Sequence, residues 1–290
     1  MTQLAQNLVN GLALGCVYAG FALGLSLLLG ILGIVNVAHS AMLVLGALVY
    51  WELVNSLGLD LLVAIVPVLA LFFVLGLGLQ RTFVRRLERE ADTTVLLTFF
   101  GVMVVIESLA VMLWTTDTRN VALGYLDGTL RFAGVNLPAS RLVAAVLTLA
   151  LFGAVYLFLT RTLAGAAIRG MAQNRDVAEM AGIPVRRLSL LVFGGGVALA
   201  AFGGVVLGLT VPFSPQEHVR WLAWSFLIVI VGGLGSVANT LLAGIALGIV
   251  ESFVGSFLSF QYTYLVIYLL LAALLLARRE GLRGGPARSL

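Results

Sequence analysis

Residues 61–80 read Leu-Leu-Val-Ala-Ile-Val-Pro-Val-Leu-Ala-Leu-Phe-Phe-Val-Leu-Gly-Leu-Gly-Leu-Gln, without one charged side chain. About 20 apolar residues cross a bilayer as a helix, so this stretch predicts a membrane span. On the same criterion we expect further spans at 8–31, 38–55, 94–115, 140–160 and 190–211, and two or three more between 221 and 277. If the glycines at 232–236 form a turn, these are 221–235, which is short enough to be a half-helix, 238–257 and 261–277. The predicted class is all-α: one transmembrane domain over residues 1–290, a helix bundle of about eight or nine spans, some of them discontinuous.

The composition agrees with a membrane protein. Of the 290 residues, 61% are hydrophobic and only 10% are charged, whereas soluble domains carry about 25% charged residues. The mean hydropathy is +1.10. A soluble chain of this size would need far more polar side chains to cover its surface. The bilayer is therefore the expected solvent, and the first apolar segment, which lacks a basic flank, is expected to remain as a membrane helix.

The basic residues exclude several functions. All 17 Lys-plus-Arg positions are Arg, and a phosphate-binding P-loop needs a Lys, so this chain does not carry that ATP site. The Arg side chains stand in short loops between apolar spans, which is typical of topology signals and not of a nucleic-acid-binding face. One Cys forms no internal disulfide, and two His with scattered acids give no credible metal site.

The positions of the Arg residues predict the orientation. Thirteen of the 17 lie in residues 81–92, residues 161–189 and the tail from Arg278 onward. Cytoplasmic loops carry an excess of Arg and Lys, so these segments are expected inside the cell. The N-terminus is then outside and the C-terminus cytoplasmic, which requires an odd number of crossings after residue 211. Residues 116–139, which hold Gly, Asp, Asn and Pro, are expected to form an external loop.

Two apolar stretches are broken by glycines. Residues 30–33 precede Val37-Ala38-His39-Ser40, and residues 232–236 precede Val237-Ala238-Asn239-Thr240. Backbone broken inside a membrane is tolerated only where protein or a water-filled cavity surrounds it. Paired interrupted segments in two halves of a chain indicate the substrate site of a transporter. The two quartets are similar to each other, although so short a similarity can also arise by coincidence.

At these motifs the sequence resembles the permease subunits of bacterial ABC importers for branched-chain amino acids. The resemblance covers essentially the whole chain. It rests on Asn10-Gly11 to Gly15, Tyr18-Ala19, Gly33-Ile34-Val35-Asn36-Val37-Ala38-His39, Gly165-Ala166-Ala167-Ile168-Arg169, Ala172-Gln173-Asn174, Ala181-Gly182-Ile183 and Gly232-Gly233-Leu234-Gly235-Ser236. The sequence departs from the family pattern at Ser40, where Gly is common, and at 278–282.

The resemblance implies a permease in the bacterial inner membrane that translocates branched-chain amino acids or related small polar solutes. It implies a second permease subunit, homologous or identical, two cytoplasmic ATPase subunits that bind the ATP, and a substrate-binding protein outside. The permease itself would be no enzyme and would hold no cofactor. The substrate stays open among Leu, Ile, Val, related amino acids, small amides and urea.

The resemblance also assigns a coupling role to residues 161–189. Permeases of ABC importers carry an acidic-Ala-Ala, three-residue, Gly pattern that forms a short helix docking on the ATPase. Here the pattern runs from Asp176 to Gly182. A terminal Gly allows a sharp left-handed turn, and Ala residues are expected to let the partner approach closely. The residues assigned to ATPase coupling are Arg169, Asp176, Ala178, Glu179 and Gly182, although a loop of this length can also hold an ordinary amphipathic turn.

The candidates for the substrate path are the polar and glycine residues of the two breaks together with one intramembrane acid: Asn36, His39, Ser40, Gly233, Gly235, Ser236 and Glu251. His39 could instead bond backbone carbonyls freed by the break. A charged side chain in mid-membrane costs about 2.5–3.5 kcal/mol, so Glu107 and Glu251 are expected to face a partner or a cavity. For Glu107 we favour a helix–helix contact; for Glu251 both roles stay open. His218 is expected to be solvated or to touch the external binding protein.

Two other functions compete with this interpretation. A proton-coupled secondary transporter would use Glu107 or Glu251 as a relay and would need no ATPase. An intramembrane serine hydrolase would pair Ser26 with His39 and would need backbone donors for an oxyanion.

Overall fold

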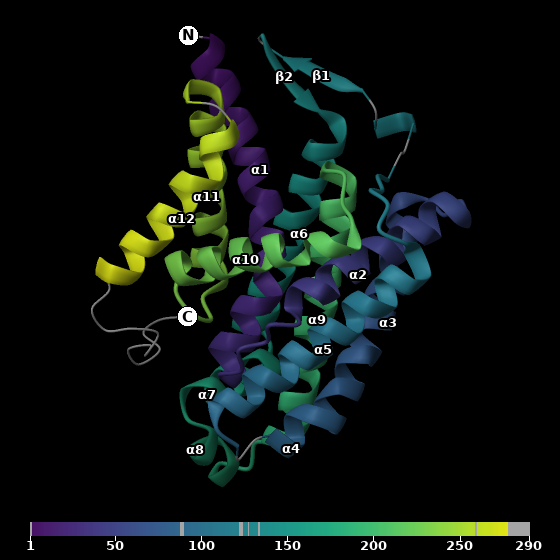
Figure 1. Ribbon diagram of the computed structural model, residues 1–290. Helices are drawn as coiled ribbons and strands as arrows, with labels where there is room; N and C mark the ends of the chain where they lie inside the picture. The colour runs from purple at the N-terminus through teal and green to yellow at the C-terminus, as the bar shows by residue number, and fades with distance from the viewer. Residues whose placement is uncertain are drawn as a thin grey trace.

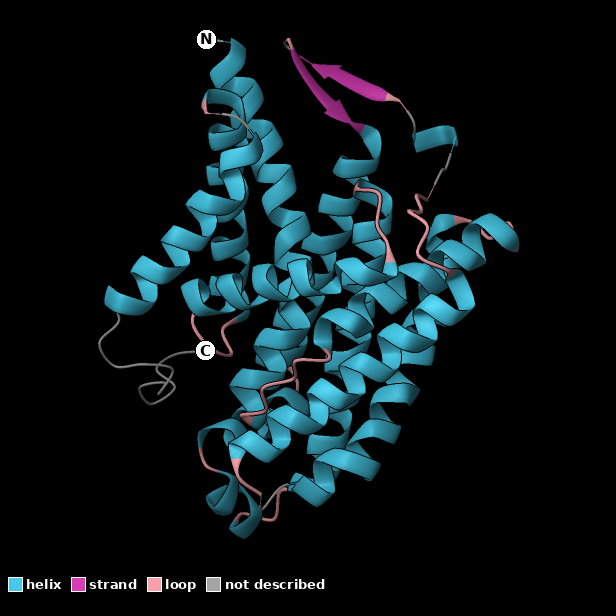
Figure 2. Ribbon diagram, viewed as in Figure 1, coloured by secondary structure: helices cyan, strands magenta, loops and turns pink. Residues whose placement is uncertain are grey.

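The computed structural model describes residues 2–87, 90–121, 124–126, 128–132, 134–258 and 260–277. Nearly all of this is helix, with one short hairpin (Figure 2). The elements are α1 (Thr2–Leu27), a π turn (Leu28–Leu32), α2 (His39–Trp51), a π turn (Glu52–Ser56), α3 (Leu61–Leu79), a π turn (Gln80–Val84), α4 (Arg85–Leu87), α5 (Asp92–Trp114), a 3₁₀ turn (Gly124–Leu126), β1 (Thr129–Phe132), β2 (Val135–Pro138), α6 (Ala139–Arg161), α7 (Leu163–Gln173), α8 (Arg175–Met180), α9 (Val185–Thr210), a 3₁₀ turn (Pro215–Glu217), α10 (His218–Gly232), α11 (Val237–Phe257) and α12 (Phe260–Ala277).

Six helices in the described part of the chain are long and apolar enough to cross a membrane: Gln3–Leu32, Leu61–Leu87, Asp92–Trp114, Ala139–Arg161, Val185–Thr210 and Val237–Phe257. The predicted all-α membrane bundle is therefore confirmed. The expected spans at 38–55 and 221–235 correspond to α2 and α10, which have 13 and 15 residues. Their crossing of the whole bilayer, and so the total of eight or nine spans, stays a prediction.

The ends of the bundle differ in charge. The Arg-bearing α4, α7 and α8 lie at one end, and the N-terminus and the hairpin lie at the other (Figure 1). This arrangement agrees with the orientation inferred from the Arg residues. The basic tail, residues 278–290, and Arg89 lie outside the described residues, so the cytoplasmic C-terminus stays a prediction.

The expected external loop contains the hairpin that the all-helical prediction did not include. Strands β1 and β2 pair antiparallel from Thr129↔Pro138 to Phe132↔Val135. The Gln6 amide nitrogen donates to the Asn136 carbonyl at 2.7 Å, and the Asn136 N–H donates back to the Gln6 amide oxygen at 2.7 Å. This paired contact fixes the hairpin to the start of α1.

Helix α1 is the centre of the bundle, since 83% of an apolar 18-residue stretch within Gln3–Leu32 is buried. It runs beside α11 in the opposite direction (Figure 1), and glycines form the contact. A Cβ at Gly11 would lie 2.7 Å from Ile249 Cα, and one at Gly244 would lie 2.7 Å from the Ala19 Cβ. Membrane helices gain stability by close packing of small residues, which explains the Gly11/Gly15 and Gly244/Gly248 spacings.

Candidate functional site

The first helix break follows the π turn that extends α1. Gly33 ends this turn with φ +68°, in the left-handed region that glycine adopts without steric cost. The chain then runs without regular structure until α2 begins at His39. The predicted discontinuity is confirmed, and the left-handed backbone at Gly33 marks the residue where the helix ends.

The second break lies between α10 and α11. Gly233 and Gly235 have φ +84° and +80°, and the Ser236 hydroxyl oxygen accepts the Asn239 N–H at 3.3 Å, which caps α11. The predicted turn at the glycine cluster is confirmed. The helix before it is shifted relative to the expected 221–235, because it ends at Gly232.

The two breaks touch each other. A Cβ added at Gly235 would lie 2.9 Å from the Gly30 Cα, so the backbones meet without side chains between them. Four residues before Gly30, the Ser26 hydroxyl lies 2.8 Å from the Thr240 hydroxyl. Thr240 also donates to the Ser236 carbonyl. The paired breaks that the sequence indicated are thus one local structure, built from both halves of the chain.

His39 makes a contact that agrees with the structural role favoured for it, although the carbonyl that it bonds lies within α1 and not at the break. Its side chain is buried, and Nε2 donates to the Phe21 carbonyl oxygen at 2.8 Å, so the start of α2 is bonded to α1. Gly24 makes room for the ring, since a Cβ there would lie 3.1 Å from the His39 Cε1. The hydrolase alternative is not supported, because Ser26 bonds Thr240 and not His39.

The polar side-chain groups of Asn36 and Ser40 are buried and lack a hydrogen-bond partner among the described residues. Both side chains are 0% exposed. Neither the Asn36 amide nor the Ser40 hydroxyl makes a hydrogen bond with any described residue. A buried polar group without a partner costs about 1–3 kcal/mol, so such groups in a fold call for a ligand, a water or a second state.

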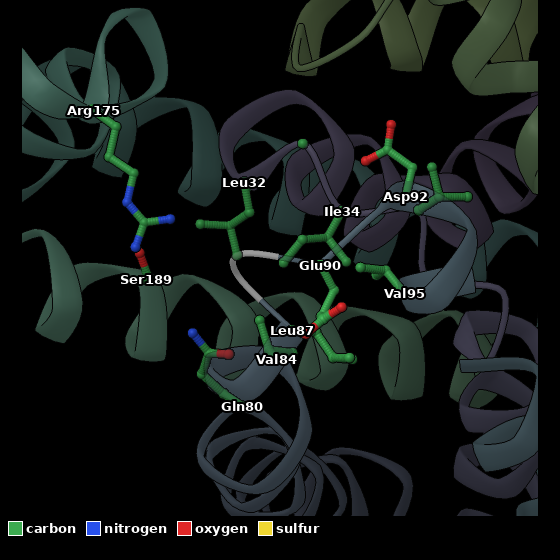
Figure 3. Close-up of a pocket in the computed structure, with 12 residues that line it drawn as sticks. Leu32, Ile34, Gln80, Val84, Leu87, Glu90, Asp92, Val95, Arg175 and Ser189 are labelled. Atoms are coloured by element: carbon green, nitrogen blue, oxygen red, sulfur yellow. The ribbon is translucent and has the colours of Figure 1, made fainter. Parts of the chain in front are cut away.

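A pocket of about 160 Å³ lies under the first break. Its lining combines residues Leu32–Val35 with Gln80, Ser189 and the charged Glu90, Asp92 and Arg175. Figure 3 shows Arg175 and Ser189 on one side, Asp92 and Val95 on the other, and Leu32 and Ile34 between them. The pocket therefore brings together the first break and the residue that begins α8.

Glu251 lies apart from the breaks. It stands fifteen residues after Ser236 on α11, about 22 Å along the helix axis. Its carboxylate is buried, accepts a hydrogen bond from Tyr18 and is near the charges of Arg220 and Arg141. The other six path candidates gather at the two breaks, whereas Glu251 belongs to a separate polar cluster at the hairpin end.

Glu107 also has a partner. Its carboxylate lies 3.8 Å from the His218 Nε2, a contact that connects α5 with α10. His218 is buried, contrary to the expectation that it is solvated, because the chain folds back after the 3₁₀ turn at Pro215–Glu217. The helix–helix role favoured for Glu107 agrees with this geometry.

The coupling segment folds into two short capped helices. The Thr162 hydroxyl oxygen accepts the Gly165 N–H at 2.9 Å at the start of α7, and the Asn174 side chain accepts the Val177 N–H at 3.0 Å at the start of α8. Helix α8 ends as the pattern predicts. Gly182 has φ +82° and donates to the Glu179 carbonyl, and Ile183 donates to the Ala178 carbonyl, which is a Schellman motif.

One predicted coupling residue faces the wrong way. Ala178 is only 4% exposed and packs in a cluster with Ile168, Met171 and Val185, so it cannot offer a surface to a partner. Arg169 is partly buried, whereas Asp176, Glu179 and Gly182 are exposed. A small residue fits close packing equally well inside the chain, which is why the pattern alone could not tell the two faces apart.

The sequence interpretation missed two exposed apolar side chains beside Ala178. Met180 is 88% exposed and Val177 is 59% exposed, and both lie on α8. In an amphipathic turn that begins at Asn174, one apolar residue points inward and its neighbours point outward. A helical wheel of residues 175–180 could have found them only if the buried face had been known.

The chain was compared with known proteins. The family described as branched-chain amino acid transport system, permease component, matches residues 7–275. The chain belongs to this permease family. The resemblance inferred from the motifs is thereby confirmed, and the chain is a multi-pass membrane transport permease.

Curated relatives of this permease match over nearly their full length. The chain is 28% identical to the high-affinity branched-chain amino acid transport system permease protein BraD of Pseudomonas aeruginosa, covering 97% of this chain and 96% of that protein. It is 27% identical to the corresponding permease protein LivH of Escherichia coli and 26% identical to LivH of Salmonella typhimurium, with the same coverage. No solved structure matches the chain.

Proposed function

We propose that this permease translocates branched-chain amino acids, or related small polar solutes, across the bacterial inner membrane in an importer driven by ATP. The full-length match to the permease family supports this proposal. In it the chain works with a second permease subunit, two cytoplasmic ATPases and an external substrate-binding protein. The permease moves solute without making or breaking bonds, and ATP is bound by the partners.

Helix α8 is the proposed docking element for an ATPase. It lies at the Arg-bearing end of the bundle (Figure 1), and it exposes Val177 and Met180, each next in sequence to an exposed acid, Asp176 and Glu179 respectively. Exposed apolar side chains with a polar rim are typical of protein contact surfaces. Ala178, on the opposite side, anchors α8 to the cluster formed with α7 and α9.

The pocket under the first break suggests how docking reaches the substrate path. Arg175, the first residue of α8, lines that pocket together with residues Leu32–Val35. A displacement of α8 by the ATPase would therefore change the pocket directly. The packed cluster around Ala178 would carry the same displacement to α9, because close-packed groups move together.

The proton-coupled alternative is less well supported. Glu107 contacts His218, and Glu251 contacts Tyr18 and lies near two Arg side chains. Both acids are thus engaged within the fold, at the end away from α8. Glu251, in addition, lies about 22 Å from the second break along α11, away from the expected path.

The test is ATP-dependent uptake of radiolabelled leucine by the purified permease, reconstituted with its ATPases and binding protein. Met180→Glu places a charge on the exposed face of α8 and is expected to lower co-purification of the ATPases or binding-protein-stimulated ATP turnover at least tenfold, an effect of about 1.4 kcal/mol. Leu57→Glu is the matched control, since Leu57 is 67% exposed beyond α2 and distant from α8 in sequence.

Uptake that persists without ATP but collapses with a protonophore would contradict the importer and favour the carrier. Wild-type assembly and turnover in Met180→Glu would contradict the docking role of α8 alone. Ala178→Arg tests folding and not docking. The Arg would place a charge in the buried cluster, so we expect it to lower the amount of folded protein.

A further inference from the structure

A second cavity, of about 460 Å³, lies among α3, α6 and α9, three helices long and apolar enough to span a membrane, and it is separate from the pocket at the first break. Its walls are Leu69 and Phe73 of α3, Val155 and Phe158 of α6, and Leu191 and Leu199 of α9. Every residue that lines it is aliphatic, aromatic or glycine. We call it the α3–α6–α9 groove.

A glycine makes this groove hollow. A Cβ added at Gly195 would meet no atom within 4 Å. At the neighbouring Gly196, by contrast, the Leu28 side chain already occupies the space where a Cβ would stand. The groove extends along α9 from Leu188 to Leu199, about 16 Å at 1.5 Å per residue. The hydrocarbon core is about 30 Å thick, so this length suits one acyl chain within one leaflet.

Positive charge stands at only one end of the groove. Arg187 precedes Leu188 and lies one turn before Leu191 on α9, and Arg161 lies one turn after Phe158 at the end of α6. Both side chains are exposed. None of the described residues of α1, α3, α6, α7 and α9, the helices that line the groove, is Asp or Glu. The end near α7 and α8 is therefore suited to an anion at the level of the lipid headgroups.

We propose that the α3–α6–α9 groove binds an anionic phospholipid, with one acyl chain over Gly195 and the phosphate between Arg161 and Arg187. Guanidinium groups bind phosphate oxygens through several N–H donors. A second copy of this chain would bring the same Arg residues to the same end and be repelled. A water-soluble partner could reach the Arg side chains but not the apolar walls.

The test is native mass spectrometry of the purified permease with phosphatidylglycerol, and with phosphatidylcholine carrying the same acyl chains. Wild type is expected to retain one phosphatidylglycerol in clear preference to phosphatidylcholine. Gly195→Leu fills the hollow, and Arg161→Gln with Arg187→Gln removes the charge; each change is expected to weaken retention about tenfold or more. Gly153→Leu is the matched control, since Gly153 also has open space on α6 but lies outside the groove.

The outcomes separate the possible occupants. Equal retention of the two lipids in wild type, or wild-type retention in Gly195→Leu, would overturn the proposal. Competition by soluble glycerol phosphate at the concentration of the lipid would also overturn it, because the site would then bind free phosphate. If Gly195→Leu does not fold, as measured by its melting temperature, the double Arg variant decides the question alone.

Discussion

The two helix breaks occupy equivalent positions 200 residues apart, from Gly33 to Ser40 and from Gly233 to Thr240, but they fold in different surroundings. At the second break the hydroxyls of Ser236 and Thr240 are both used, because Ser236 caps α11 and Thr240 bonds Ser26. At the first break Asn36 and Ser40 are buried without a bond to any described residue. Similar sequences thus start a helix in both places, while the position in the bundle decides whether the polar groups are satisfied.

This difference indicates which break has unused binding capacity. The first break lies over the pocket that reaches α8, and its polar groups could serve a solute or a second conformation. At the second break Gly235 packs directly against Gly30 of the first, so this break acts as a support. We expect changes at the second break to affect folding and changes at Asn36 to affect transport. The comparison can be tested with matched substitutions in the two breaks.

The largest effect is expected for Gly235→Ala. Both Gly235 and Gly33 have positive φ, but only the Gly235 position would place a Cβ against backbone, 2.9 Å from the Gly30 Cα. Gly33→Ala should cost about 1–2 kcal/mol from conformation alone. Gly235→Ala adds the steric conflict, for a total of about 3 kcal/mol or more. Melting temperature and yield of assembled complex measure this, and equal losses in both variants would show that the breaks do not touch.

An intermediate effect is expected for His39→Leu. It removes the bond from Nε2 to the Phe21 carbonyl and should destabilise the protein by about 1 kcal/mol. Asn239→Leu changes the equivalent position of the second break, where the side chain is exposed, and should stay within about 0.5 kcal/mol. Since the His39 ring bonds within the fold, we expect leucine uptake per folded His39→Leu molecule to match wild type. A loss of uptake at normal stability would instead place His39 on the path.

The smallest effect is expected at the last residues of the two similar quartets, Ser40 and Thr240. Thr240→Val removes the contact with Ser26 and should cost about 0.6 kcal/mol, the average for such bonds between membrane helices. Ser40→Ala removes a hydroxyl that bonds no described residue and should be neutral or slightly stabilising. A double-mutant cycle of Ser26→Ala with Thr240→Val isolates the pair. If Ser40→Ala costs more than Thr240→Val, the first break has a partner that stabilises it.

Much of the candidate site could be predicted from sequence because its signals are local. Glycines with positive φ mark both breaks, and the pattern from Asp176 to Gly182 marks the end of α8. The orientation of side chains could not be predicted in the same way. Ala178 and Met180 are two residues apart on one short helix, yet one is buried and the other almost fully exposed. Which face is buried depends on α7 and α9, which the local pattern does not contain.

By itself the sequence determined the solvent of this protein, its helical class, the positions of its breaks and its family. These follow from apolar runs longer than a bilayer needs, from the spacing of glycines and from motifs quoted residue by residue. Only the tertiary structure decided that the two breaks meet at Gly30 and Gly235, that Glu251 lies about 22 Å from them along α11, and that one pocket is lined by both the first break and Arg175 of α8. The physical reason is that hydropathy and backbone preference act within a few residues, whereas contacts between distant helices depend on how all the surfaces pack together.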